Sequence, residues 1–225
     1  MGHTAMIQVL GAIAYGEQKA HEAAVAEAAA ATDAVERRAL RKIAAEELRH
    51  HKGFVRRLVA LGADPERAMS PYRSSLDTYH GAHKGSSMEE AVWAYLGEGV
   101  ADDLLSWLRG VADPETAAFI DTVVVDEVEH EARAAATLRA LLEGDPALKT
   151  EATAAARAMP LRMLRSGSRG PSLVRFGAFL RVGAPQDLVA GLATGYFRRL
   201  RAIGIDPLPC NVLHLDPLRL LRPAA

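Results

Sequence analysis

Two Glu-x-x-His motifs occur in the chain, and each follows a single glutamate at nearly the same distance. Glu and His three residues apart lie on one face of a helix, so each motif can grip one metal ion. The two copies are 80 or 81 residues apart, which indicates a repeated pair of ligand-bearing helices. The sequence therefore predicts a site for two metal ions, formed by Glu17, Glu47, His50, Glu98, Glu127 and His130.

Four carboxylates and two imidazoles suit iron or manganese, whereas a softer site would contain cysteine. The alternative is that these residues are solvated helix charges, as most isolated Glu-x-x-His sequences are. The apolar pattern argues against it, because the six residues fall in line with Leu, Ile, Val and Phe, and an unpaired buried carboxylate costs several kcal/mol. We expect two Fe ions, with Mn as the alternative in one or both positions, and Glu47 and Glu127 as bridging ligands.

Acidic residues precede both motif glutamates. Glu46 and Asp126 can accept the far ring N–H of a metal-bound histidine and fix its tautomer, unless they are surface charges. His21 and Asp102 lie one turn beyond the single glutamates, in corresponding positions of the repeat. Each is expected either as an additional ligand or as a hydrogen-bond partner of a ligand carboxylate.

Two tyrosines flank the single glutamates. The phenol of Tyr15 or Tyr95 could donate a hydrogen bond to an oxygen that bridges the metals, and plain packing in the core is the alternative. The chain contains no nucleophile elbow, phosphate loop or dinucleotide fingerprint. We therefore predict no catalytic residue beyond the metal centre.

Long helices must carry these residues. Apolar residues recur at three- and four-residue steps around every predicted ligand, which is typical of helices that face a core. Capping signals mark the helix ends. The predicted helices run from near Thr4 to Ala31, from Asp33 to Gly62, from Ser87 with Glu90 as its capping partner, and from Asp113-Pro114 to near Gly144.

The connection from Gly62 to Ser87 is much longer than the other two, and a bundle with one long crossover has the ferritin-like topology. We therefore predict an all-α fold in two parts. Residues 1–145 form a ferritin-like four-helix bundle, and residues 146–225 form a basic helical extension packed on it. Within the extension we expect helices around 147–158, 172–182 and 185–203, with a break at Pro160, and an extended segment over 207–223.

The composition fits a protein with a sizeable core that lies outside a membrane. Hydrophobic residues make up 49% of the 225 residues, and no run of about 18 consecutive apolar residues occurs. The single cysteine, Cys210, excludes an intrachain disulfide and a thiolate metal site. We expect a cytoplasmic protein without a transmembrane segment.

The net charge of −1 hides an uneven distribution, because residues 151–225 contain eleven Arg and only four acidic residues. This basic segment could contact RNA, an anionic substrate, a membrane surface or the acidic bundle beside it. Arg162, Arg165 and Arg169 recur at three- and four-residue steps and are the predicted substrate contacts. No DNA partner is expected.

At Glu17, Glu47-x-x-His50, Glu98 and Glu127-x-x-His130 the chain resembles the ferritin-like di-iron superfamily, over roughly residues 5–143. Three flanking stretches resemble actinobacterial proteins related to the tRNA isopentenyl-adenosine hydroxylase. The resemblance implies an iron cofactor, O₂ as co-substrate and insertion of an oxygen atom into an unactivated C–H bond. These stretches are Ala14-Tyr15-Gly16-Glu17, Leu61-Gly62-Ala63-Asp64-Pro65 and Tyr95-Leu96-Gly97-Glu98-Gly99.

The first functional hypothesis is an O₂-dependent di-iron monooxygenase, a hydroxylase that acts on an organic substrate such as a modified tRNA nucleoside. Its electrons would come from an external ferredoxin or reductase, because the chain has no flavin or iron–sulfur motif. The alternatives are a ferroxidase or peroxide-scavenging ferritin-like protein and a bundle that binds metal for structure alone. A homodimer is left open.

Overall fold

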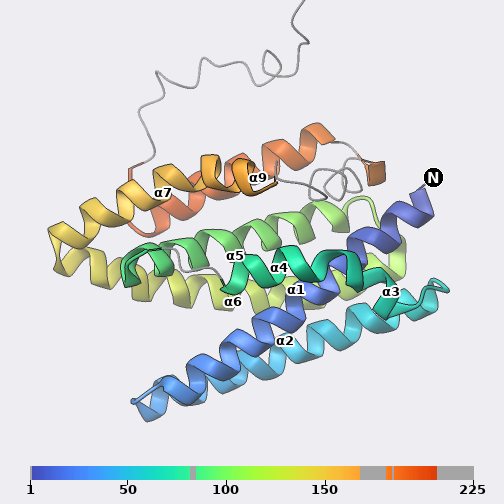
Figure 1. Cartoon of the computed structure of the whole chain (residues 1–225), viewed down its shortest axis with the longest axis horizontal. Helices are drawn as coiled ribbons and strands as arrows, with labels where there is room; N and C mark the ends of the chain where they lie inside the picture. The colour runs from blue at the N-terminus through green and yellow to red at the C-terminus, as the bar shows by residue number, and fades with distance from the viewer. Residues whose placement is uncertain (1, 82–84, 168–180, 184, 207–225) are drawn as a thin grey trace, which may run out of the picture.

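The computed structural model describes residues 2–81, 85–167, 181–183 and 185–206, and every regular element in these ranges is a helix (Figure 1). The predicted all-α fold is confirmed. None of the helices in the described ranges is long and apolar enough to cross a membrane. In chain order the elements are α1 (Gly2–Ala30), α2 (Ala34–Ala60), α3 (Pro65–Met69), the 3-10 helix η1 (Ser70–Tyr72), α4 (Arg73–Gly81), α5 (Ser87–Arg109), α6 (Pro114–Gly144), α7 (Pro146–Gly167) and α9 (Pro185–Ala202).

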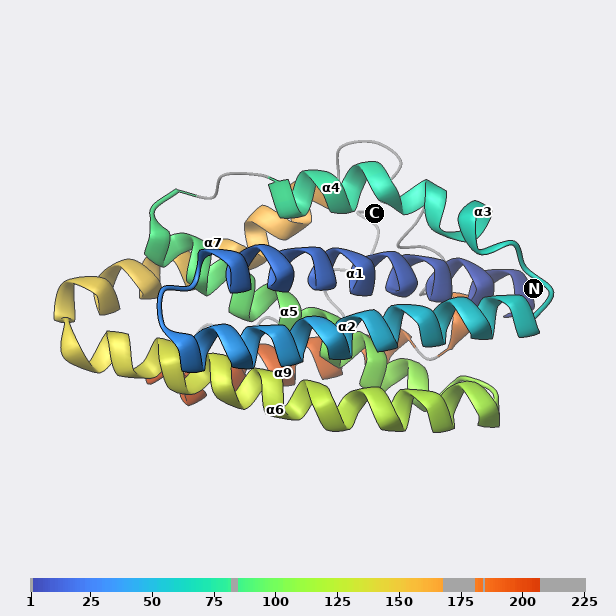
Figure 2. The same ribbon diagram turned by 90° about the horizontal axis from the view of Figure 1, so that it is seen from below.

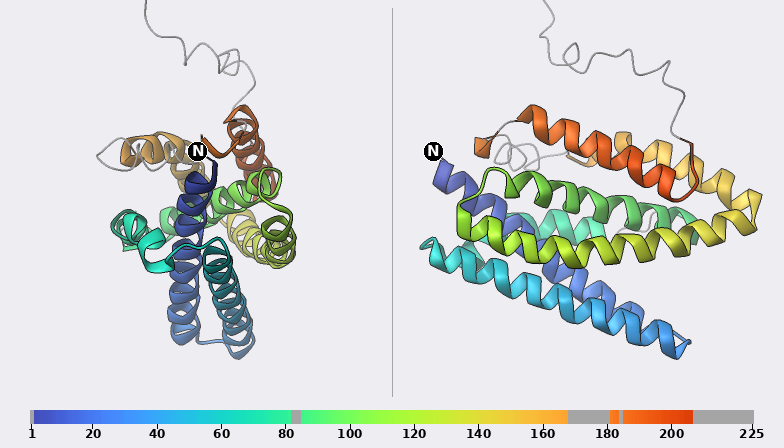
Figure 3. Two further views of the ribbon diagram at one scale, coloured as in Figure 1. Left: turned by 90° about the vertical axis from the view of Figure 1, so that its right-hand side faces the viewer. Right: turned by 180° about the vertical axis from the view of Figure 1, so that it is seen from behind.

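Two helical hairpins form the bundle. α1 packs along α2, α5 packs along α6, and α2 contacts α6, so that α1, α2 and α6 lie side by side in Figure 2. The single long crossover between the hairpins contains α3, η1 and α4, which pack against α1 (Figure 3). This arrangement confirms the ferritin-like topology predicted from the long connection.

The helix ends follow the capping signals closely. The Asp33 side chain accepts a hydrogen bond from the Glu36 backbone N–H at the start of α2, and Gly62, with φ of 74°, ends that helical segment. One predicted cap is wrong by a residue. Ser86, rather than Ser87, caps α5, because its hydroxyl and the Glu89 side chain form the reciprocal capping box.

α7 and α9 cover the face of α5 that is turned away from α2 (Figure 1). The predicted break at Pro160 is wrong, since α7 continues to Gly167. A proline leaves the carbonyl four residues earlier without its helical donor. Here that carbonyl belongs to Ala156, and it accepts a hydrogen bond from the Tyr196 hydroxyl of α9 at 2.8 Å. Most of the predicted helix 172–182 and the segment 207–223 lie outside the described residues.

Apolar side chains form two clusters along the bundle. One joins the first half of α1 to α3, to the ends of α2 and α5, to the start of α6 and to Leu188 of α9. The other joins α5 and α6 to α7 and the end of α9. Glu17 and His50 lie beside the first cluster, where Tyr15 precedes Glu17 by two residues and Phe54 follows His50 by one turn. The polar residues are therefore held on helices that apolar packing fixes on either side.

Gly11 allows close packing between α1 and the crossover. A Cβ atom added there would lie 2.3 Å from the Ala68 backbone oxygen, and backbone cannot move aside as a side chain can. We expect Gly11→Ala to lower the free energy of unfolding by about 1–3 kcal/mol in urea denaturation. Gly16→Ala is the matched control on the same helix, because nothing lies within 4 Å of its added Cβ. It should raise stability by up to about 1 kcal/mol, and an equal loss in both variants would contradict the packing argument.

Candidate metal centre

Four of the six predicted ligands converge at the centre of the bundle. Glu17, Glu47, His50 and Glu127 each offer one ligand atom, and these atoms all lie within 4.8 Å of one another. They come from α1, α2 and α6, and three of the residues are less than a tenth exposed. The His130 ring lies nearby, with its centroid 6.5 Å from that of His50.

Glu47 and Glu127 each reach both histidines. One carboxylate oxygen of Glu47 lies 3.6 Å from Nδ1 of His50, and its other oxygen lies 3.2 Å from Nδ1 of His130. Glu127 repeats the pattern at 3.1 and 3.4 Å. Two carboxylates that each face two imidazoles have the geometry of bridging ligands, the role predicted for this pair.

The acidic residues before the motif glutamates cross over between helices. Nε2 of His50 on α2 lies 2.9 Å from Asp126 of α6, and Nε2 of His130 on α6 lies 3.0 Å from Glu46 of α2. A neutral ring that donates its Nε2–H to such a carboxylate turns the Nδ1 lone pair toward the cluster. Arg49 in turn pairs with Asp126 at 2.5 Å. The structure thus places Glu46 and Asp126 where they can orient the rings.

Charge balance within the cluster is set by these contacts. Burial disfavours the charged ring of His50, but the carboxylates of Glu127, Glu17 and Glu47 outweigh it and raise its pKa to about 12. The same competition raises the pKa of His130 to about 11. Burial also acts against the Glu47 carboxylate, whose pKa nevertheless falls to about 2 because both histidines stabilise its charge. Burial dominates for Glu17 and raises its pKa well above the usual value.

The donor set fits a pair of hard or borderline metal ions. Nδ1 of His50 and Nδ1 of His130 are both buried without a well-directed hydrogen bond, although carboxylate oxygens lie within 3.6 Å. Buried polar atoms are rarely left in this state, and here both nitrogens point into one group of carboxylates. Imidazole nitrogen and carboxylate oxygen are donors that suit iron and manganese.

Metal binding at this cluster should strengthen as the pH rises. With pKa values of about 12 and 11, both imidazoles carry a proton in the metal-free protein near neutral pH, and a metal must displace it from Nδ1. The apparent affinity should rise about tenfold per pH unit for each displaced proton. Calorimetric Mn²⁺ titrations in buffers of different ionisation enthalpy measure that proton release. An affinity independent of pH between about 6 and 8 would contradict the assignment of these nitrogens.

Glu98 differs from its counterpart Glu17. Glu98 lies outside the compact group of four and is exposed, whereas Glu17 is 8% exposed. The surrounding protein still desolvates Glu98 and, together with repulsion from Glu27, Glu47 and Glu127, raises its pKa to about 8. Because solvent reaches this residue, the desolvation is only partial. The sequence repeat predicts that Glu17 and Glu98 occupy equivalent positions around the metals. In the structure Glu17 belongs to the compact group of ligands and Glu98 lies outside it.

The other predicted neighbours have different partners. His21 contacts the Ala44 carbonyl of α2 at 2.7 Å, and the Tyr15 hydroxyl donates to Asp77 of α4 at 2.7 Å. Asp102 lies 3.6 Å from the buried Arg199 of α9. Tyr95 is packed in the second apolar cluster, and its buried hydroxyl has no hydrogen-bond partner among the described residues. Arg169 lies outside the described residues, as do the side chains of Arg162 and Arg165.

Sequence reasoning missed a buried charge network next to the cluster. Arg199 pairs with Asp103 and Glu131, and Gly99 and Gly195 leave the space for it. The basic segment is therefore used at least in part within the molecule, one of the predicted alternatives. Two signals pointed to this network: a glycine in the middle of each of two helices, and an arginine in line with Leu188 and Leu192 of α9.

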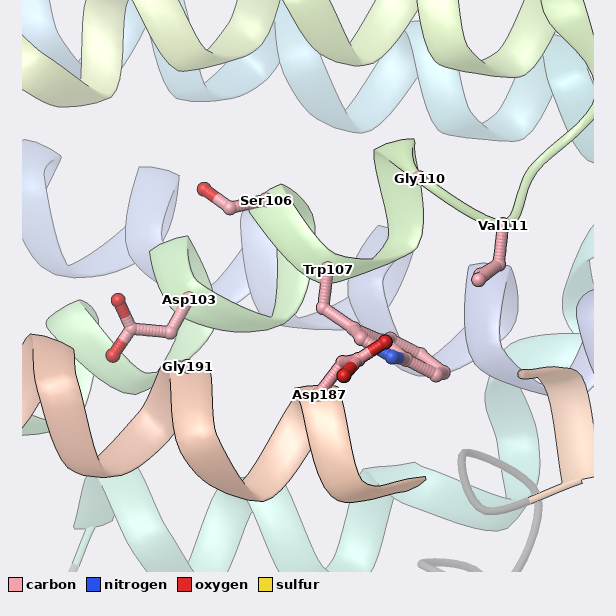
Figure 4. A pocket seen from close by; sticks show the side chains of 7 residues that line it. All are labelled: Asp103, Ser106, Trp107, Gly110, Val111, Asp187 and Gly191. Atoms are coloured by element: carbon pink, nitrogen blue, oxygen red, sulfur yellow. The ribbon is translucent and has the colours of Figure 1, made fainter. Parts of the chain in front are cut away.

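A pocket of about 380 Å³ lies between α5 and α9, away from the candidate ligands (Figure 4). None of the six predicted ligands lines it. One of its lining residues, Asp103, pairs with Arg199. We therefore do not treat it as the site of the chemistry. Its lining residues are Asp103, Ser106, Trp107, Gly110, Val111, Asp187 and Gly191.

Two helical hairpins with one crossover, enclosing a buried group of glutamates and histidines, define a ferritin-like protein with a candidate metal site. Residues 2–165 match the family described as ferritin-like domain, actinomycetes, and the chain belongs to this family. This confirms the ferritin-like part of the predicted resemblance. No match was found among curated proteins, and the predicted closer relation to the tRNA hydroxylase is untested.

A solved structure from Synechococcus is also similar to this chain. It is described as protein 19 with aldehyde deformylating oxidase activity, and the similarity covers 95% of both chains with a TM-score of 0.71. The sequence identity is 21%. At that identity the comparison shows a shared fold, and the chemistry of this chain must be argued from its own residues.

Proposed function

We propose that the protein is an O₂-dependent di-iron oxygenase that acts on an organic substrate. The observation that carries the proposal is the pair of carboxylates, Glu47 and Glu127, that each reach the unpaired Nδ1 atoms of both histidines. Two iron ions bound there would supply the reducing electrons and the Lewis acidity needed to activate O₂ for attack on a C–H bond. Glu17 and His50 would hold one ion, and Glu98 and His130 the other.

The surrounding residues support this chemistry by fixing the ligands and limiting water. Asp126 and Glu46 hold the far nitrogens of the two rings, which fixes the tautomer that binds metal. Apolar side chains beside Glu17 and His50 leave both residues less than a tenth exposed. Glu98 is the exposed member of the set, so the substrate and O₂ would approach from its side.

Two classes of substrate suit a centre of this kind. The resemblance of the ligand flanks to the tRNA isopentenyl-adenosine hydroxylase supports a modified tRNA nucleoside, and the fold shared with the Synechococcus protein makes an aldehyde a second class to test. If tRNA binds, its affinity should fall steeply with salt. Arg198 and Arg199 are paired within the molecule, which leaves other arginines for phosphates.

Oxygen uptake by the iron-loaded protein tests the proposal. The protein is loaded anaerobically with two equivalents of Fe²⁺ and exposed to O₂ with a chemical reductant, and His130→Ala is the matched variant. An oxygenase centre should consume O₂ repeatedly at the expense of the reductant, and the variant should not. Uptake only in proportion to newly added Fe²⁺ would instead identify a ferroxidase. Iron that binds without any reaction would leave a structural role.

A further inference from the structure

Arg199 joins α9 to the two helices that carry Glu98 and His130. It is 1% exposed, and its Nη1 and Nη2 atoms contact the two carboxylate oxygens of Asp103 on α5 at 2.7 and 3.1 Å. Its Nε donates to Glu131 of α6 at 2.9 Å. Asp102 of α5 lies 3.6 Å from the same guanidinium. A planar group with five donors is suited to bridge several carboxylates in this way.

The partners of Arg199 are the immediate neighbours of one half of the candidate metal centre. Glu131 follows His130 in the sequence, and Asp102 lies one turn beyond Glu98. Gly99 follows Glu98, and a Cβ atom there would lie 1.9 Å from Nε of Arg199. The guanidinium therefore packs directly against the α5 backbone next to Glu98.

In the other half of the centre, the positions that correspond to two partners of Arg199 join α1 and α2 directly. His21 and His51 occupy the positions that correspond, 81 and 80 residues earlier, to Asp102 and Glu131. Nδ1 of His21 contacts the Ala44 carbonyl at 2.7 Å, and Nδ1 of His51 contacts the Ala14 carbonyl at 2.8 Å. These contacts tie α1 directly to α2. In the second copy, the corresponding carboxylates converge on α9 instead.

We propose that Arg199 is a positioning residue for the metal position formed by Glu98 and His130, so that docking of α9 controls the occupancy of one of the two positions. The inference rests on the proposed di-metal centre and adds a residue that does not touch the metals. It agrees with the looser arrangement of Glu98 compared with Glu17. No partner of Arg199 adjoins Glu17 or His50 in the sequence, so the position formed by these two residues should change less when Arg199 is replaced.

Mn²⁺ titration of the full chain, followed by calorimetry, tests this assignment. Wild type should bind two ions. Arg199→Lys keeps the charge but cannot bridge Asp103 and Glu131 together, so one ion should bind about 10- to 100-fold more weakly. The other ion should bind within about threefold of wild type, because Arg199 contacts only residues next to Glu98 and His130. Glu98→Gln should weaken the binding of the same ion.

Two further variants separate positioning from a general loss of stability. Gly195→Ala places a methyl group 2.0 Å from the Asp103 carboxylate and so disturbs the network without changing Arg199 or a ligand. It should reproduce the selective loss. Arg57→Lys is the matched control, because Arg57 joins Asp113 and Thr116 of α6 to α2 at a distance from the cluster. This variant should bind both ions as wild type does.

The outcomes distinguish the two proposals. Wild-type protein that binds fewer than two ions would overturn the di-metal centre and the role of Arg199 with it. Two ions bound with wild-type affinity in both Arg199→Lys and Gly195→Ala would overturn only the role of Arg199. An equal loss of affinity for both ions would show that Arg199 supports the fold in general, which also contradicts the inference.

Discussion

Glu127→Ala should abolish the binding of both metal ions. The two oxygens of this carboxylate face Nδ1 of His50 and Nδ1 of His130 at 3.1 and 3.4 Å, so its removal deprives both positions of a shared ligand. Loss of a residue that only supports a ligand costs about 10- to 100-fold in metal affinity, and loss of a bridging ligand should cost at least about a hundredfold. Equilibrium dialysis against Fe²⁺ or Mn²⁺, with metal analysis of the retained protein, measures this effect.

Glu129→Ala provides the control on the same helix. Glu129 is exposed and pairs with Lys42 at 2.9 Å, two residues along from Glu127. This variant should retain two ions with unchanged affinity and nearly unchanged stability, since an exposed ion pair contributes about 0–1 kcal/mol. Retention of one tightly bound ion by Glu127→Ala would show that this carboxylate serves one position only.

Arg199→Met should cause a large loss of stability although the residue lies outside the metal cluster. The variant leaves the carboxylates of Asp103 and Glu131 largely buried without their common partner. Breaking a buried ion pair by removing one member costs about 3–5 kcal/mol, and we expect a loss of that size in the free energy of unfolding. Urea denaturation of the metal-free protein at neutral pH gives the value.

The pH dependence of this loss has a definite sign. Burial raises the pKa of Asp103, and Arg199 opposes that rise. Without Arg199 the carboxyl group can avoid an unpaired charge by taking up a proton, so the deficit of the variant should shrink as the pH falls toward about 5. Arg198→Met is the control, because Arg198 is exposed and its loss should cost under about 1 kcal/mol. A deficit that grows on acidification would contradict the network.

The sequence predicted the ligand-bearing helices because two independent signals coincide in it. The apolar repeat places Glu47 and His50 on the buried face of a helix, and the second copy repeats the spacing 80 residues later. Capping residues such as Asp33 and Asp113 fix where those helices start. The apolar repeat and the capping residues depend only on neighbouring residues, so they can be recognised in the sequence before the fold is known.

Features that depend on contacts between distant helices could not be predicted in the same way. The repeat makes Glu17 and Glu98 equivalent, but the distances between helices leave only Glu17 inside the compact group. Pro160 is tolerated because the Tyr196 hydroxyl, far away in the sequence, satisfies the carbonyl that the proline leaves free. Arg199 belongs to the basic segment, for which the sequence leaves several partners open, and only the fold brings it to Asp103 on α5 and Glu131 on α6.

Mössbauer spectroscopy of the protein loaded with ⁵⁷Fe and oxidised in air tests the central claim most directly, because it reports whether two irons share ligands. We expect two irons per chain in a spin-coupled pair that is silent in electron paramagnetic resonance and is lost in Glu127→Ala. A single iron with the magnetic spectrum of an isolated ferric ion, unchanged by that substitution, would contradict it.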